Sequence, residues 1–121
     1  MPTKQTFRRQ WRFYETAAGN KPVKEFLDAL DLKIASEVVA AMKHVQDVGL
    51  AAARHLRGDI WEVRVETGNQ AFRVLFSPEG HYKQVLLSLE AFSKKTQKTP
   101  KASIQLAERR LADWRRRGSS K

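Results

Sequence analysis

The sequence predicts an α+β domain in which a small antiparallel β-sheet has helices packed on one face. Three observations support this class. Apolar residues recur at helical spacing as far as Gly49, and from Asp59 the period changes to two. Two turn sequences, Gly68-Asn69 and Pro78-Glu79-Gly80, separate the alternating segments, which is typical of a meander. The last segment returns to helical spacing and predicts a basic C-terminal helix.

The first half is expected to hold one short strand and two helices. Residues 11–14 alternate as a strand. Pro22 suits the first turn of a helix, whose apolar positions are Val23, Phe26, Leu27 and Leu30. Asp31 can cap a second helix, which ends at Gly49 and has an apolar stripe of Leu32, Ala35, Val38, Val39, Met42 and Val45. Residues 50–57 are expected to form a connector.

The second half is expected to hold three strands and the last helix. The first strand directs Trp61, Val63 and Val65 to one face and Glu62, Arg64 and Glu66 to the other. The second strand does the same with Phe72, Val74 and Phe76 against Arg73, Leu75 and Ser77. Residues 85–89 are apolar on both faces, which is typical of a central strand. The last helix opens at Thr99-Pro100, with a seam of Ile104, Ala107, Leu111 and Trp114.

Charge is concentrated at the two ends of the chain. The 121 residues carry a formal net charge of +10, of which residues 1–14 contribute +4 and residues 94–121 contribute +8. Cationic ends of this kind attract polyanions, nucleic acids first. We expect one domain over residues 1–121, with flexible basic ends at 1–10 and 116–121. The absence of cysteine and of any long apolar run favours a soluble, cytoplasmic protein.

A candidate site follows from the strand pattern. If the apolar rows pack on the helices, the opposite face presents Glu62, Arg64 and Arg73 together, and the segment from Lys94 to Lys98 ends near it. The alternative is a solvated surface with cross-strand Glu–Arg pairs, each worth roughly 0.2–1 kcal/mol. The three histidines are too dispersed for a metal site; they are His44, His55 and His81.

Several of these segments together resemble one known family. They are Leu56-Arg57-Gly58-Asp59-Ile60-Trp61-Glu62-Val63-Arg64, Phe72-Arg73-Val74-Leu75-Phe76 and, most specifically, Phe92-Ser93-Lys94-Lys95-Thr96-Gln97-Lys98-Thr99-Pro100. The order and content resemble the RelE/HigB-like toxins, in particular their phage-derived branch. The resemblance implies a twisted antiparallel sheet with helices on one side. It also implies a type II toxin that cuts messenger RNA on the translating ribosome, without a metal or organic cofactor, and that an antitoxin with a helix-turn-helix domain holds silent.

The resemblance also suggests roles for individual residues. Metal-free cleavage uses the ribose 2′-hydroxyl to attack the adjacent phosphate, so the enzyme must bind that phosphate and move protons. Arg73 is the predicted phosphate clamp, and Lys94 or Lys95 is predicted to stabilise the transition state or transfer a proton. Glu62 is a candidate base. Candidate RNA-binding residues are Arg64, Lys98 and Lys101. For Glu62 and Arg64 the alternative is a surface ion pair.

Two other functions remain open at this point. ParE-like toxins share the fold and inhibit DNA gyrase by binding, without cutting RNA. A non-catalytic nucleic-acid-binding module is the other alternative, because the segment from Thr96 to Lys101 lacks the tyrosine that some RelE-type toxins place there. Arg73 with Lys94 and Lys95 favours the nuclease.

Overall fold

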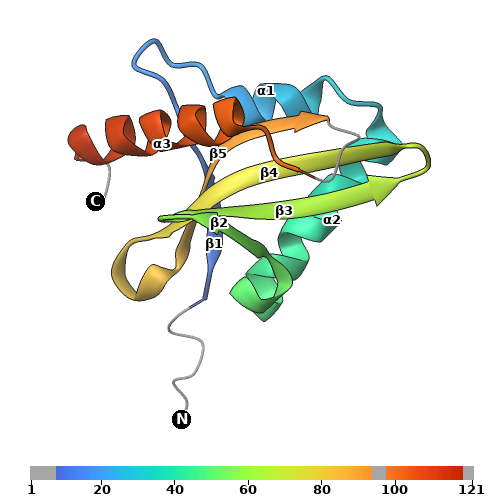
Figure 1. Ribbon diagram of the computed structural model, residues 1–121, viewed down its shortest axis with the longest axis horizontal. Helices are drawn as coiled ribbons and strands as arrows, with labels where there is room; N and C mark the ends of the chain where they lie inside the picture. Colours follow the sequence, from blue (N-terminus) through green and yellow to red (C-terminus); the bar gives the residue numbers. More distant parts are fainter. Residues whose placement is uncertain (1–7, 94–97, 119–121) are drawn as a thin grey trace.

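The computed structural model describes residues 8–93 and 98–118 of the chain. It confirms the predicted α+β class (Figure 1). The elements in chain order are β1 (Gln10–Phe13), α1 (Pro22–Asp28), α2 (Leu32–Val48), the short 3-10 helix η2 (Leu50–Ala52), β2 (Arg54–Arg57), β3 (Ile60–Thr67), β4 (Gln70–Glu79), the short 3-10 helix η3 (His81–Lys83), β5 (Val85–Ser93) and α3 (Lys101–Arg116).

The sheet is mixed rather than wholly antiparallel. Its strand order is β1-β5-β4-β3-β2, and β3, β4 and β5 form the predicted antiparallel meander. β1 lies beside β5 and runs parallel to it, with Trp11 opposite Leu86. A parallel pair needs a long connection between its strands, and here that connection contains both early helices and the three other strands. β5 is therefore a central strand, as its two apolar faces predicted.

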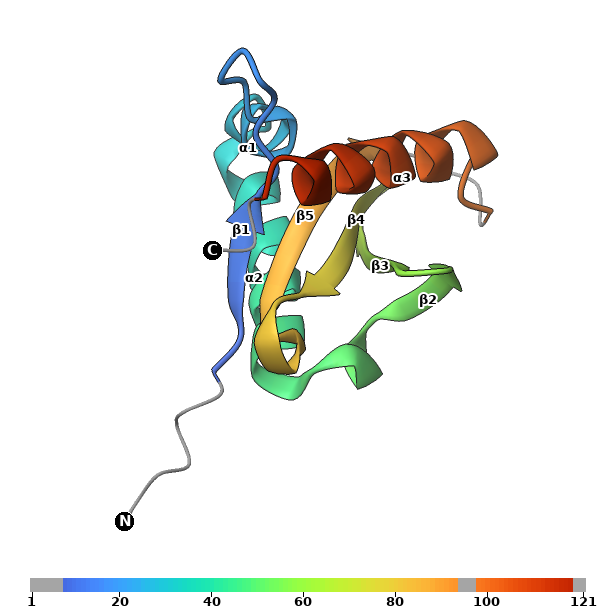
Figure 2. The same cartoon turned by 90° about the vertical axis from the view of Figure 1, so that its left-hand side faces the viewer.

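The first core lies between the sheet and the helices α1 and α2, which cover one face (Figure 2). Val38, Met42 and Val45 of α2 pack here. The sheet contributes the rows predicted from the alternation, which are Val63 and Val65 of β3 and Phe72, Val74 and Phe76 of β4. Burial of these side chains accounts for the position of both helices.

The second core lies on the opposite face, under α3. Leu75 of β4 and Leu87 and Leu89 of β5 are fully buried there against Ala107, Leu111 and Trp114 of α3. The expectation that helices pack on one face only was therefore wrong. The physical reason is that the central strands are apolar on both faces, so each face needs a cover.

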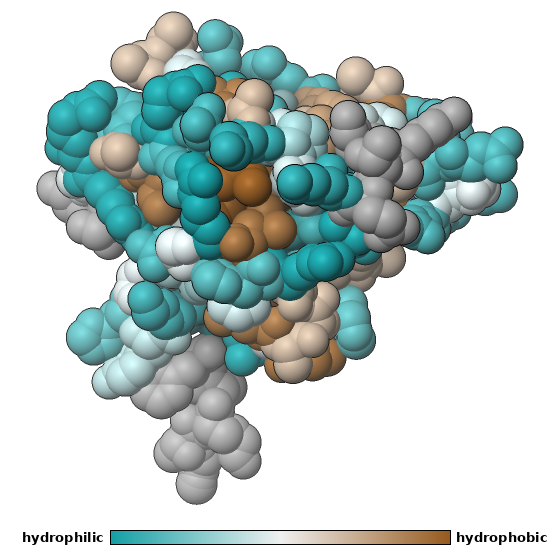
Figure 3. Space-filling model, in the orientation of Figure 1, coloured by the Kyte–Doolittle hydropathy of each residue, from teal (hydrophilic) through white to brown (hydrophobic). Residues whose placement is uncertain are grey.

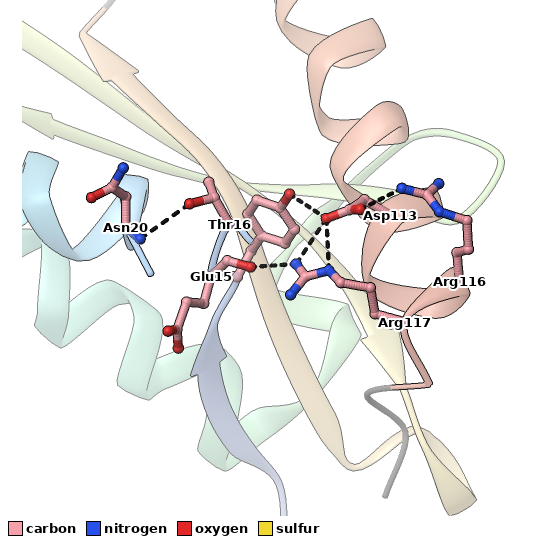
Figure 4. Close-up of polar contacts among 7 residues, drawn as sticks. Glu15, Thr16, Asn20, Asp113, Arg116 and Arg117 are labelled. Atoms are coloured by element: carbon pink, nitrogen blue, oxygen red, sulfur yellow. Dashed lines mark hydrogen bonds and ion pairs between the residues drawn. The ribbon is translucent and has the colours of Figure 1, made fainter. Parts of the chain in front are cut away.

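Polar contacts hold the C-terminal end of α3 against the segment that follows β1 (Figure 4). The Tyr14 hydroxyl donates to Asp113 at 2.6 Å, and Arg117 donates to the same carboxylate at 2.8 Å and to the Glu15 carbonyl oxygen. The hydroxyl and the guanidinium lower the pKa of Asp113. Burial, followed by the Asp113 carboxylate, raises the pKa of Tyr14. Of the predicted flexible end at 116–121, Arg116 is the last residue of α3 and Arg117 follows it, and residues 119–121 lie outside the described residues.

The segment 50–57 is more than the predicted connector. Its second half forms the edge strand β2, in which Arg54 lies opposite Glu62 and Arg57 opposite Ile60. The sequence Arg54-His55-Leu56-Arg57 lacks apolar alternation because an edge strand gains its pairing from backbone hydrogen bonds to one neighbour. Within residues 8–93 and 98–118, no helix has the length and apolar character that crossing a bilayer requires.

Candidate functional site

Two arginines lie directly opposite each other on the face of the sheet that α3 partly covers. Arg64 of β3 pairs in register with Arg73 of β4, and Glu62 precedes Arg64 by two residues on the same face. The Gly68-Asn69 turn sets this register, because Thr67 and Gln70 are the first pair of the hairpin. Like charges opposite each other are unfavourable, so the pair depends on a nearby anion.

Glu62 supplies that anion from within the protein. Arg64 Nε donates to Glu62 Oε1 at 2.7 Å, while the Thr99 hydroxyl donates to Glu62 Oε2. Arg73 Nη1 donates to Thr99 Oγ1 at 3.0 Å and lies 3.9 Å from Glu62 Oε2. Thr99 therefore connects the segment before α3 to the two sheet residues.

The charged groups of this cluster are mostly buried, unlike those of a surface ion pair. Glu62 is 0% exposed and Arg73 3% exposed, whereas the Arg64 side chain keeps 22% of its surface accessible. The Glu62–Arg64 pair is therefore not the solvated surface pair that the sequence left open. Burial, followed by the charge of Arg64, lowers the pKa of Arg73, and Glu62 opposes that shift. A guanidinium still remains charged at neutral pH.

A cavity of about 300 Å³ adjoins the cluster. The described residues that line it include three with cationic side chains: Arg54, Arg64, Lys98, His55, Thr99, Leu56 and Ile104. The side chain of His55 lies on the other face of the sheet, because His55 pairs with Trp61 and its ring contacts the Trp61 ring. Among these described lining residues there is no carboxylate. In the orientation of Figure 1, the surface below α3 has an apolar area bordered by hydrophilic side chains (Figure 3). The cavity is thus suited to an anionic ligand that also carries flat apolar groups.

A larger hollow of about 600 Å³ lies where the β3–β4 hairpin approaches α2. Its charged lining residues are Asp31 and Lys33, which balance each other. Because it has no excess charge, the smaller cationic cavity is the better candidate site.

The structure brings together most of the residues selected from the sequence. Glu62, Arg64 and Arg73 form one cluster, and Lys98 lines the adjoining cavity. Lys101 is the exposed first residue of α3 and is not among the residues that line the cavity. Lys94 and Lys95 lie outside the described residues.

Sequence reasoning missed two residues of this site. Arg54 falls in the predicted connector, and Thr99 falls at the predicted start of the last helix. A signal for the edge strand was present, because the segment from Arg54 is followed by a Gly58-Asp59 turn that leads into β3. His55 Nε2 lies 2.8 Å from the Gly58 carbonyl oxygen and its ring centroid is 5.0 Å from that of Trp61, so the imidazole lies on the face of the sheet opposite the cavity.

The comparisons with known proteins support the family that the sequence motifs resemble. Residues 25–112 match a protein family described as "Phage derived protein Gp49-like (DUF891)". Two proteins of Mycobacterium tuberculosis, from strains CDC 1551 / Oshkosh and ATCC 25618 / H37Rv, are each 36% identical to the chain over 109 residues. The alignment covers 88% of this chain and 85% of each relative. Both relatives are named "Probable endoribonuclease HigB1".

Proposed function

Because this chain belongs to the Gp49-like family of phage-derived proteins, we propose that it is the toxin of a type II toxin–antitoxin pair and an endoribonuclease that cuts messenger RNA. The resemblance to RelE/HigB-like toxins is confirmed by the family match and by the two relatives. The ribosome as the place of cleavage, the metal-independent reaction and the residue roles below are parts of the proposal.

The cationic cavity carries this proposal. RNA offers a phosphate that needs positive charge and bases that need apolar or aromatic contacts, and the cavity supplies both. We assign the phosphate contacts to Arg64, Arg54 and Lys98, whose side chains line it. Arginine donates two parallel hydrogen bonds to a phosphate and keeps its charge, which suits the negative charge that develops in the transition state.

The buried layer beneath the cavity holds this charge in place. Glu62 accepts from Arg64 and from Thr99, so both of its oxygens are engaged and neither is accessible. This arrangement suits the orientation of Arg64 better than the abstraction of a proton from RNA. Arg73 adds a positive charge directly beneath the residues that line the cavity. The Arg73→Ala variant in the cleavage assay tests its predicted contact with the scissile phosphate.

Cleavage also requires a group that exchanges protons near neutral pH. The 2′-hydroxyl must lose a proton and the departing 5′-oxygen must gain one. We assign proton transfer to Lys94 or Lys95, the candidates from the sequence, which lie outside the described residues. Lys101 is assigned to RNA binding outside the cavity.

The proposed partners follow from the same assignment. We propose that the substrate is messenger RNA on the translating ribosome, and that a cognate antitoxin with a helix-turn-helix domain suppresses the activity. The excess positive charge of +10 favours an acidic antitoxin segment as well as RNA.

The experiment is cleavage of a defined messenger RNA by the purified chain, in a translation extract and in buffer without ribosomes. We expect Arg64→Ala to reduce the cleavage rate by about 100-fold or more, as for loss of one charged contact to a transition state. Arg57→Ala is the matched control, because Arg57 is also an arginine of the sheet, at the end of β2, but it pairs with Glu108 and does not line the cavity. Arg73→Ala, Lys94→Ala and Lys95→Ala test the remaining roles, with circular dichroism to confirm folding.

The outcomes separate the candidate functions. A substrate with a 2′-deoxyribose at the cleavage position should resist, because the attacking hydroxyl is absent. Unchanged messenger RNA with inhibited gyrase supercoiling would instead indicate a ParE-like binding toxin. Full activity of Arg64→Ala and Arg73→Ala together would refute the proposed site.

A further inference from the structure

The turn between β4 and β5 contains two consecutive residues with a left-handed backbone. Tyr82 has φ 63° and Lys83 has φ 58°, and neither is glycine. Turns with positive φ at two successive positions strongly favour Asn-Gly, because other side chains are strained there. The sequence Tyr-Lys is therefore not the choice that backbone conformation alone would select, and residues held in such strain cluster at functional sites.

Packing of the Tyr82 side chain in a hydrophobic core does not compensate for this strain. It is 65% exposed, and it is not a member of either hydrophobic core. Its ring packs edge-to-face against His81, with centroids 4.3 Å apart. The turn thus presents two adjacent aromatic rings to solvent.

Basic residues adjoin this turn in the fold. Lys83 belongs to the turn itself, and the Gln10 amide donates to the Gln84 carbonyl oxygen at 2.8 Å, which places the start of β1 next to the turn. Arg8 is exposed and lies two residues before that contact, whereas the Arg9 guanidinium donates to the Gln46 carbonyl oxygen of α2 at 3.1 Å. We call Arg8, His81, Tyr82 and Lys83 the aromatic turn surface.

This surface lies far from the cationic cavity. Figure 1 shows the turn between β4 and β5 at the end of the sheet remote from the β3–β4 hairpin. Glu79, at the end of β4 next to the turn, lies six positions after Arg73, a span of about 20 Å at the usual rise of a strand. The two surfaces cannot contact the same nucleotide.

We propose that the aromatic turn surface binds single-stranded RNA by stacking a base on Tyr82 while Arg8 and Lys83 contact the backbone. This inference rests on the proposed function and extends it to a second contact, distant from the cleavage position. Exposed rings beside cations are the usual platform for single-stranded nucleic acid, since every base has a face that can stack. A protein partner is the competing occupant, and the net charge of the surface disfavours a second copy of this chain.

The test measures binding of a fluorescent 2′-O-methyl RNA oligonucleotide to the full chain by fluorescence anisotropy. Methylation blocks the attacking hydroxyl, so the probe is bound without being cut. We expect Tyr82→Gly to weaken binding roughly 5- to 150-fold, as for loss of one stacked base. The same substitution should raise the melting temperature, because glycine adopts a positive φ without strain. Tyr82→Phe keeps the ring and should bind like the parent chain.

Leu32→Ala is the matched control, because Leu32 is 82% exposed on α2 and lies outside the surface. Tyr82→Gly with unchanged binding would overturn the inference, and so would a loss confined to binding of the antitoxin. Weak binding by Tyr82→Phe as well would exclude stacking. Cleavage of messenger RNA by the parent chain is measured separately. If the chain cuts RNA but its RNA binding does not depend on Tyr82, this inference alone is refuted. If RNA binding depends on Tyr82 but the chain does not cut RNA, the proposed function alone is refuted.

Discussion

Replacement of Glu62 by glutamine should destabilise the domain far more than replacement of an exposed glutamate in a similar ion pair. Glu62 is 0% exposed and is the acidic partner of both Arg64 and Arg73. Glu62→Gln keeps the shape of the side chain but removes its charge. The buried guanidinium of Arg73 then loses its compensating anion, and that loss is the main expected cost.

The magnitude follows from burial. Removal of one partner from a buried ion pair costs about 3–5 kcal/mol, and the retained amide keeps part of the hydrogen bonding, so we expect about 3 kcal/mol. With a urea slope of about 1–3 kcal/mol per molar for a small domain, the unfolding midpoint should fall by about 1–3 M. Glu108→Gln is the matched control, because Glu108 pairs with Arg57 at 2.7 Å while both side chains are more than a third exposed. Exposed pairs contribute little, so that midpoint should barely move.

The assay is urea unfolding followed by circular dichroism at pH 7, at low and high salt. The Glu62→Gln difference should persist at high salt, because buried charges are poorly screened. Equal stability of the two glutamine variants, or a Glu62→Gln effect that salt abolishes, would refute the view that a buried anion holds the two arginines.

Four further predictions concern the rest of the fold. The lowered pKa of Asp113 means that its contribution to stability is present above the ordinary pKa of aspartate and is lost as the pH falls through the lower folded value. Below about pH 4, the melting temperature of the parent chain should therefore fall more steeply with pH than that of Asp113→Asn. The raised pKa of Tyr14 predicts a second fall in melting temperature above about pH 10, which Tyr14→Phe should remove. Gly49→Ala should destabilise by about 1–3 kcal/mol, since Gly49 has φ 103° and an added Cβ would lie 2.7 Å from Arg9 Nη2; unchanged stability in urea would contradict this. Leu111→Ala should cost about 2–5 kcal/mol by opening the core under α3, and a smaller loss would mean that α3 packs loosely.

Local patterns in the sequence were sufficient for the meander and for one half of the candidate site. Alternation put Glu62 and Arg64 on one face, and the Gly68-Asn69 turn fixed the hairpin so that Arg64 meets Arg73. These features depend on neighbours within one hairpin. The period of a strand and the length of its turn determine them before any other part of the chain is considered.

The cover over that face depends on contacts between distant parts of the chain. The apolar seam of α3 showed that the helix packs on something, but amphipathicity does not specify which face of a sheet receives it. The side chains of Leu75, Leu87 and Leu89 determine that choice, because they would otherwise remain exposed opposite the first core. The same cover takes Glu62 and Arg73 out of solvent.

The sequence by itself determined the strands of the meander, the order of the helices and the charged residues that share one face, because each follows from the periodicity of a short segment. Only the tertiary structure decided the parallel pairing of β1 with β5, the contribution of Arg54 from the edge strand β2, and the contact of Thr99 with Glu62 and Arg73. Each of these joins parts of the chain that are distant in sequence or pairs backbone groups without an apolar signature. Such contacts leave no periodic trace in a single sequence, since burial and hydrogen bonding select them only once the two cores have formed.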